Sequence, residues 1–218
     1  MVARNVSLAE LTGARLHIAH ISTAGSVRMV REAKARGLKV TAEACPHHFT
    51  LTEETTRGYN THAKMNPPLR TSQDVQAIKD GLRDGTIDVI ATDHAPHATQ
   101  EKQQEFTEAP FGIVGLETAL SLTLALVEEG VLTLESAVDK LATAPAKAFS
   151  LNAGTLAVGA PADVAIVDPN LEWEVDPSRF RSKSRNTPFA GWKVKGRVTK
   201  TIVSGRVVYE LDRPGRPA

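Results

Sequence analysis

The 218-residue chain has one cysteine, few aromatic residues and no long hydrophobic run. The single cysteine, Cys45, excludes an internal disulfide framework and is typical of a protein that works in a reducing compartment such as the cytoplasm. No stretch approaches the ~18 uninterrupted apolar residues of a membrane span. The first 20 residues also lack the apolar core of a secretory signal. We therefore expect a cytoplasmic protein with no membrane segment.

The chain also lacks an excess of charge of either sign. Lys and Arg number 26 against 25 Asp and Glu, so the formal net charge is +1. This balance does not favour nucleic acid or an anionic membrane surface as a partner. With 41% hydrophobic and 23% charged residues, the composition is that of an ordinary globular protein. Composition therefore predicts a substantial core but names no substrate.

Strand and helix patterns alternate through the first two thirds of the chain. Strands are predicted over residues 16–21, 38–44 and 87–92, and helices over 26–36, 72–83, 115–129 and 134–144. Repeated βα units predict an α/β fold, with a parallel sheet covered by helices. From about residue 152, short strands and Gly turns predict a small β module. We therefore expect two units, 1–151 and 152–218, with a frayed tail from Asp212 to Ala218.

Two connections in the first unit are unusually long. Residues 46–71 and 93–114 each follow the carboxyl end of a predicted strand and show no clear periodicity. Long structureless loops in a compact domain tend to be functional. In parallel sheets and barrels, active sites lie at this end of the strands. We therefore expect the functional residues in or beside these two connections.

His20 and Asp93 end the first and third predicted strands. An imidazole and a carboxylate at strand ends are suitable ligands for Zn²⁺ or a similar ion. Alternatively, His20 is a hydrogen-bonded core histidine. A carboxylate after a buried strand is costly unless it is paired or bound to a metal, which favours a function for Asp93. Two ligands do not close a metal site, so the spacing alone leaves the question open.

The other histidines favour structural roles. Although His47 and His48 follow the second strand, we expect one to pack and the other to be solvated rather than to bind a metal. Cys45 beside them is expected in the core. His17 is out of phase with the strand-end histidine, and His62 lies in a polar loop where we expect it to be exposed.

Two proline-containing segments are candidate ligand-binding loops. Two prolines follow Asn66 and restrict the backbone, which favours an amide held toward a ligand. A rigid turn with an exposed Asn explains the pattern equally well. Near the end of the second long connection, Phe111 and Gly112 offer backbone N–H groups to an anion, or form a simple junction between a loop and a helix.

Six segments, taken in order, make the chain resemble the dihydroorotases of the amidohydrolase superfamily over essentially its whole length. They are residues 17–23 (HIAHIST), 41–48 (TAEACPHH), 64–70 (KMNPPLR), 90–97 (IATDHAPH), 109–118 (APFGIVGLET) and 184–189 (SRNTPF). The NPPLR segment is more similar to dihydroorotase than to hydantoinase or allantoinase.

The resemblance implies a fold, a reaction and a set of site residues. The fold would be a TIM-like (βα)₈ barrel with a small β-sandwich, and the chain would hold the last three βα units and the β-sandwich module. The reaction is the reversible, Zn²⁺-dependent hydrolysis of dihydroorotate to N-carbamoyl-aspartate in pyrimidine biosynthesis. By resemblance, His20 and Asp93 are zinc ligands and Asp93 is also the catalytic acid and base. The implied substrate-binding residues are Asn66, His97, Phe111 and Gly112.

The chain departs from the family pattern in its missing ligands. The His-x-His pair, the strand-four carboxylate or carboxylated lysine and the strand-five histidine have no counterpart. We therefore expect the C-terminal half of a dihydroorotase, opening just before barrel strand six, with an incomplete binuclear zinc site and negligible activity alone. An unpaired sheet edge would favour a homo-oligomer. The alternatives are a non-catalytic scaffold, for example for aspartate transcarbamoylase, or another cyclic amidohydrolase such as hydantoinase or allantoinase.

Overall fold

A three-stranded parallel sheet forms the centre of the first unit in the computed structural model, which describes residues 1–211. Its strands are β1 (Leu16–Ile18), β2 (Val40–Ala44) and β3 (Val89–Ile90), and β2 lies in the middle. Leu16 aligns with Val40, and Glu43 aligns with Val89. The predicted α/β fold with a parallel sheet is confirmed. Each strand is shorter than predicted: β1 ends three residues early, β2 begins two residues late, and β3 is two residues shorter at each end.

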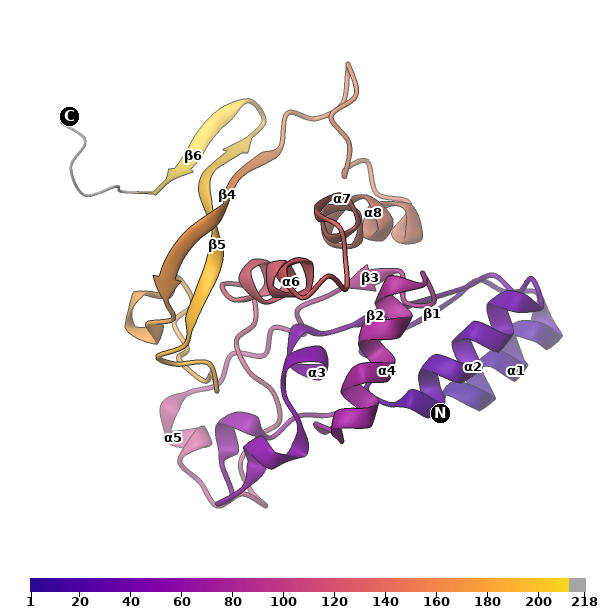
Figure 1. The fold of residues 1–218 in the computed structure, drawn as a ribbon, viewed down its shortest axis with the longest axis horizontal. Coiled ribbons are helices and arrows are strands. Elements are labelled where there is room, and N and C mark those ends of the chain that lie inside the picture. The colour runs from indigo at the N-terminus through magenta and orange to yellow at the C-terminus, as the bar shows by residue number, and fades with distance from the viewer. Residues whose placement is uncertain (212–218) are drawn as a thin grey trace.

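Helices α1 (Val2–Thr12), α2 (Ala24–Ala35) and α4 (Ser72–Arg83) lie side by side against this sheet (Figure 1). Helix α4 has the predicted bounds, and α2 begins two residues earlier than expected. The Thr23 hydroxyl accepts a hydrogen bond from the Ser26 N–H, which caps α2. Helix α1 was not predicted. The apolar faces meet the sheet in a core that includes Val27, Val30, Ile78, Leu82 and Ile87.

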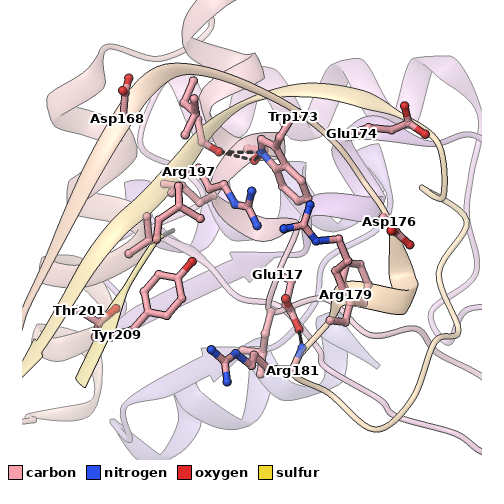
Figure 2. A pocket seen from close by; sticks show the side chains of 18 of the residues that line it. Glu117, Asp168, Trp173, Glu174, Asp176, Arg179, Arg181, Arg197, Thr201 and Tyr209 are labelled. Carbon is pink, nitrogen blue, oxygen red and sulfur yellow. Dashed lines mark hydrogen bonds between the residues drawn. The ribbon is translucent and has the colours of Figure 1, made fainter. Parts of the chain in front are cut away.

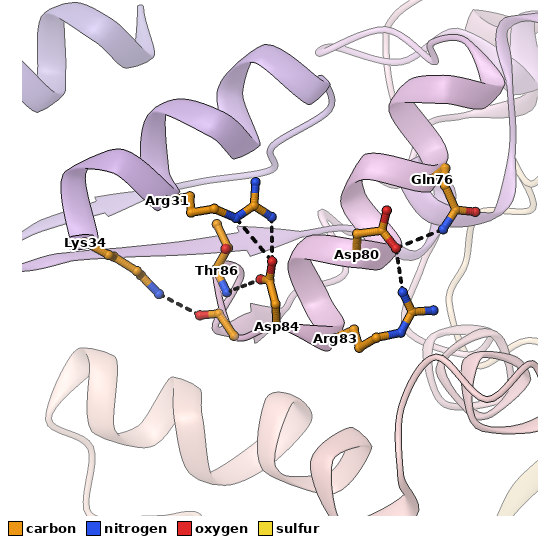
Figure 3. A network of polar contacts seen from close by, with 8 residues as sticks. Arg31, Lys34, Gln76, Asp80, Arg83, Asp84 and Thr86 are labelled. Atoms are coloured by element: carbon orange, nitrogen blue, oxygen red, sulfur yellow. Dashed lines mark hydrogen bonds and ion pairs between the residues drawn. The ribbon is translucent and has the colours of Figure 1, made fainter.

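Ion pairs join α2 to the chain that leaves α4. Figure 3 shows Arg31 on α2 reaching the carboxylate of Asp84, at 2.6 Å, while the Thr86 N–H donates to the same carboxylate at 2.9 Å. Lys34, one turn further along α2, pairs with Asp88 at 2.7 Å. These contacts fix the tight turn that leads from α4 into β3.

The two long connections contain short helices. The first holds α3 (Pro46–Thr50), η1 (Glu53–Thr56) and η2 (Thr61–Ala63), and the second holds α5 (Thr99–Lys102). The expectation of structureless loops was therefore wrong. Elements of three to five residues are too short to display a hydrophobic period in the sequence.

Helices α6 (Ala119–Glu128), α7 (Leu134–Val138), η3 (Asp139–Thr143) and α8 (Ala144–Phe149) follow β3. The first starts four residues later than predicted. The helix expected over 134–144 continues to residue 149 through the π-helical turn η3. Pro145, in the first turn of α8, has no N–H for the preceding turn, which explains the change of hydrogen-bond pattern there.

The last part of the chain forms a second, antiparallel sheet on the other side of α6 (Figure 1). Its strands are β4 (Val164–Glu174), β5 (Lys193–Val203) and β6 (Arg206–Glu210). Ser204 and Gly205, with φ of 50° and 76°, form the tight turn between β5 and β6. Residues 152–211 thus supply one layer of strands, and the second layer of the expected β-sandwich does not occur among them. The predicted tail, 212–218, lies outside the described residues.

None of the helices found within residues 1–211 has both the length and the apolar character needed to span a bilayer.

Candidate active site

His20 and Asp93 stand at corresponding positions, just beyond the carboxyl ends of the two outer parallel strands. Their φ angles are 36° and 46°. Positive φ is uncommon for residues other than glycine and costs about 1–3 kcal/mol, and such residues concentrate at functional sites. Each of the two predicted metal ligands therefore has a strained backbone conformation at the point where the chain leaves its strand.

His20 has a ring nitrogen free for a ligand. Its Nδ1 is buried and has no hydrogen-bond partner among residues 1–211. Its backbone N–H donates to Glu43, with 3.4 Å between N and Oε1. The other Glu43 oxygen lies 3.0 Å from His17 Nε2, so His17 has a structural contact, as expected. An unpartnered buried imidazole nitrogen fits a role as a metal ligand.

The environment of Asp93 differs from the one that we expected. Asp93 is exposed, and its carboxylate makes no hydrogen bond or ion pair with any residue in the described part of the chain. The argument from the cost of a buried carboxylate was therefore wrong, because this residue is exposed rather than buried. An exposed, unpaired carboxylate at a strand end is free to bind a cation or to accept a proton.

Cys45, His47 and His48 form a buried cluster where β2 meets α3. Their exposed fractions are 0%, 2% and 3%, and one donor atom from each lies within 4.8 Å of the others. The two imidazole rings are 4.2 Å apart between centroids. Cys45 is in the core as expected, but the expectation that one histidine is solvated was wrong. Helix α3 begins immediately after the strand and turns both rings inward.

The electrostatics of this cluster connect it to His20 and Asp93. Burial lowers the pKa of His48 to about 4; its hydrogen bond to the Pro67 carbonyl and the charge of Asp93 oppose this shift, while His20 adds to it. Burial also lowers the pKa of His47, with smaller effects from His48 and His20. For the Cys45 thiol, burial raises the pKa, and Asp93 adds to the effect. His20 and Asp93 therefore act on the same buried imidazole.

Asn66 belongs to a loop that reaches this cluster. The residue is exposed, its peptide bond to Pro67 is cis, and its amide has no hydrogen-bond partner among residues 1–211. The next carbonyl, of Pro67, lies 2.9 Å from His48 Nε2. The loop is thus anchored beside the end of β2 while the Asn66 amide remains free.

His97, Phe111 and Gly112 meet through backbone groups. His97 Nε2 lies 2.9 Å from the Phe111 carbonyl oxygen. The Gly112 N–H donates to the Lys64 carbonyl at 2.8 Å. We expected this N–H to be available to an anion, but it is already hydrogen-bonded within the protein.

Buried lysines were missed by the sequence reasoning. Lys64 Nζ donates to the Thr107 carbonyl at 3.0 Å, and Lys102 Nζ donates to the Pro110 carbonyl at 2.8 Å. Both lysines are less than 10% exposed. Burial, followed by the charge of Lys64, lowers the pKa of Lys102 to about 8. No sequence signal identified them, because lysine in a polar loop ordinarily faces solvent.

Asn186 was also missed, although it lies within one of the six motif segments. Its side chain accepts from the His97 N–H at 3.2 Å and donates to the carbonyls of Ala95 at 2.9 Å and Gly112 at 3.2 Å. It therefore joins the two ends of the long connection after β3. His62, expected to be exposed, is instead half-buried, with an unpartnered Nδ1 among the described residues.

A cavity of about 940 Å³ lies elsewhere, between α6 and the antiparallel sheet. Figure 2 shows Arg179, Arg181 and Arg197 around it together with Trp173. None of the six predicted site residues lines it. The predicted site residues and this cavity are therefore separate features.

This chain is similar to proteins named as dihydroorotases and as hydantoinases. The Amidohydrolase family matches residues 6–208. The dihydroorotase of Syntrophotalea carbinolica is 62% identical over 211 residues, which cover 97% of this chain and 50% of that protein. The dihydroorotase of Geobacter metallireducens is 60% identical, with 95% and 49% covered.

Among solved structures, the L-hydantoinase (dihydropyrimidinase) of Arthrobacter aurescens has a TM-score of 0.91 at 32% identity, covering 96% of this chain and 48% of its own. The chain thus spans about half the length of the curated relatives that it matches. The resemblance to dihydroorotase that the six motifs indicate is confirmed, and the chain belongs to the amidohydrolase family.

Proposed function

We propose that this chain carries part of the active site of a dihydroorotase, which reversibly hydrolyses dihydroorotate to N-carbamoyl-aspartate in pyrimidine biosynthesis. The observation that carries the proposal is the arrangement of His20 and Asp93. Both occupy strained positions beyond parallel strands, and both act on the pKa of His48. The segments that hold them belong to a chain about 60% identical to dihydroorotases.

The residues present fit a divalent metal ion. The unpartnered Nδ1 of His20 offers a lone pair, and the Asp93 carboxylate is unpaired within the described residues. Zn²⁺ is the ion that the family resemblance implies, as part of a binuclear site that is incomplete here. When bound, zinc supplies acidity to water and polarises the carbonyl that is attacked.

The chain's own residues would move the proton and hold the substrate. Asp93 takes a proton from the attacking water and passes it to the amide nitrogen as the ring C–N bond breaks. The Asn66 amide and His97 would orient the ring and its carboxylate. The backbone at Phe111 and Gly112 would line the same position, next to the Pro110 and Gly112 carbonyls to which Lys102 donates.

The architecture follows the same proposal. Residues 1–151 would form the last three βα units of a TIM-like barrel, and residues 152–218 would belong to a β-sandwich. His-x-His does not occur in the chain, so activity without the missing ligands would be negligible. Within residues 1–211, β1 and β3 each have a strand on one side only, which favours association with another copy or with the rest of a barrel. A cytoplasmic location agrees with the single cysteine.

A scaffold role is the second candidate, with aspartate transcarbamoylase as a partner. The missing ligands favour it. The strained conformations of His20 and Asp93 argue against it, because a scaffold gains nothing from them. Hydantoinase or allantoinase activity is a further alternative. The identity of 32% to a hydantoinase against 62% to a dihydroorotase argues against it.

A chimera tests the proposal. The N-terminal half of the S. carbinolica dihydroorotase would be fused to this chain, and turnover of dihydroorotate and hydantoin would be compared. We expect dihydroorotate hydrolysis that falls at least about 1,000-fold in Asp93→Asn and His20→Ala. His62→Gln is the matched control and should retain activity.

Other outcomes separate the candidate functions. Turnover of hydantoin alone, or full activity in Asp93→Asn, would contradict the proposed mechanism. A folded but inactive chimera that binds aspartate transcarbamoylase would favour the scaffold.

A further inference from the structure

Cys45, His47 and His48 offer three soft or intermediate donors at the start of α3. Their donor atoms lie within 4.8 Å of one another, and all three side chains are at least 97% buried. Ligand bonds of about 2.0–2.3 Å place three donors around a metal roughly 3.5–4 Å apart. The cluster therefore needs to contract by only about 1 Å to surround an ion.

A hydrogen bond prepares His48 as a ligand. Its Nε2 lies 2.9 Å from the carbonyl oxygen of Pro67. A carbonyl only accepts, so Nε2 carries the hydrogen and Nδ1 of the neutral ring keeps its lone pair. That Nδ1 is buried and has no partner among residues 1–211. Histidines that bind metals are commonly held in this way, with the second nitrogen donating to a carbonyl.

The charge of the donor set selects the kind of ion. One thiolate and two neutral imidazoles carry a single negative charge, so a monovalent cation leaves the buried site neutral. A divalent ion leaves a net positive charge in the core, which is costly. Thiolate ligands also favour soft ions such as Cu⁺.

We propose that Cys45, His47 and His48 form a three-coordinate site for a soft monovalent metal ion, Cu⁺. As the sulfur–copper bond forms, the Cys45 thiol releases its proton to solvent and copper keeps its oxidation state. Its three ligands are different residues from the neighbouring His20 and Asp93 pair, and the site does not depend on the proposed hydrolase function.

Anaerobic titration of the 218-residue chain with Cu⁺, against a chromogenic chelator, tests this site. We expect one Cu⁺ per chain and an ultraviolet band from thiolate-to-copper charge transfer. X-ray absorption should find one sulfur and two nitrogen neighbours. Because Cys45 is the only cysteine in the chain, any thiolate signal must come from it.

Variants identify the ligands. Cys45→Ala should lose the band and weaken binding by at least about 100-fold, and His48→Gln should weaken it by at least about 10-fold. His62→Gln is the matched control, since His62 also has an unpartnered Nδ1 but lies outside the cluster. His20→Ala should keep one Cu⁺ per chain, which separates this site from the proposed zinc site.

Three results would overturn the inference. They are no copper retained against the chelator, an affinity unchanged in Cys45→Ala, or a spectrum with sulfur but no nitrogen neighbours. If Cys45→Ala does not fold, as judged by circular dichroism, the X-ray absorption of the unmodified chain decides.

Discussion

Single residues at this site depend on close backbone approaches. Gly112 has a φ of +101°, and a Cβ added to it would lie 2.5 Å from the Ala95 Cβ. The carbonyl oxygen of the preceding residue, Phe111, lies 2.9 Å from His97 Nε2, and the Gly112 N–H donates to the Lys64 carbonyl at 2.8 Å. A side chain at this position would push the two ends of the connection apart.

Gly112→Ala should therefore lower the free energy of unfolding by about 2–4 kcal/mol, combining backbone strain with overpacking. Urea denaturation would measure it. Gly13→Ala is the control, because Gly13 has a φ of +69° but nothing within 4 Å of the added Cβ. It should cost only about 1 kcal/mol. Equal costs for the two variants would mean that the contact with Ala95 is unimportant.

Lys102 should produce a pH dependence of stability. Burial lowers its pKa to about 8 in the folded protein, against about 10.4 when unfolded. Between these values the unfolded chain binds more protons, so stability rises with pH, by at most about 1.4 kcal/mol per pH unit. Below about pH 8, Lys102 is charged in both the folded and the unfolded protein, and burial of that charge lowers the free energy of unfolding by its full amount.

Thermal unfolding of wild type and Lys102→Met at pH 7.5 to 10.5 would measure this. The rise in stability with pH that Lys102 causes should disappear in the variant. The variant also loses the hydrogen bond to the Pro110 carbonyl. Parallel curves for the two proteins would show that the lysine titrates normally.

Among the elements, α2 and α4 are held together at their N-termini by one carboxylate. Asp74 Oδ1 accepts from the Ala24 N–H at 2.8 Å, and Oδ2 accepts from the Thr71 hydroxyl at 2.8 Å. Burial opposes ionisation, but these hydrogen bonds outweigh it and lower the pKa of Asp74. The stabilisation is therefore present at neutral pH and is lost as pH falls through the folded-state pKa.

Asp74→Ala should lower the unfolding free energy by about 1–2 kcal/mol at pH 7, because it removes caps from two helices. The difference from wild type should shrink as the pH falls below the usual range of an aspartate pKa and the carboxylate protonates. Asp80→Ala, which removes a carboxylate from the exposed contacts with Gln76 and Arg83 (Figure 3), is the control and should cost under about 0.5 kcal/mol.

In the molecule as a whole, α6 links the two sheets. The Ser121 hydroxyl donates to the Gly196 carbonyl on β5 at 2.7 Å, and the Trp173 indole N–H donates to the same carbonyl at 3.1 Å. Ser121 is 3% exposed. This buried contact holds the antiparallel sheet against the helix.

Ser121→Ala should cost about 1 kcal/mol, and the loss should be local. Amide hydrogen exchange should become faster in β4 and β5 while β1 and β2 keep their protection. Thr123→Val is the control, because the Thr123 hydroxyl bonds to Ala119 within its own helix. Uniform acceleration across both sheets would mean that the molecule opens as one unit.

The sequence by itself determined the parallel βα order, the bounds of α4 and the resemblance to dihydroorotase. These follow from local periodicity and motif order, which need no knowledge of distant contacts. Three features required the tertiary structure: the burial of both His47 and His48, the exposure of Asp93, and the carbonyl contacts of Lys64 and Lys102. Each depends on which segments pack over a side chain, and a lysine or histidine carries the same local signal in water or in the core. Burial, and with it the pKa and the ligand chemistry, is a property of neighbours that the chain brings together only by folding.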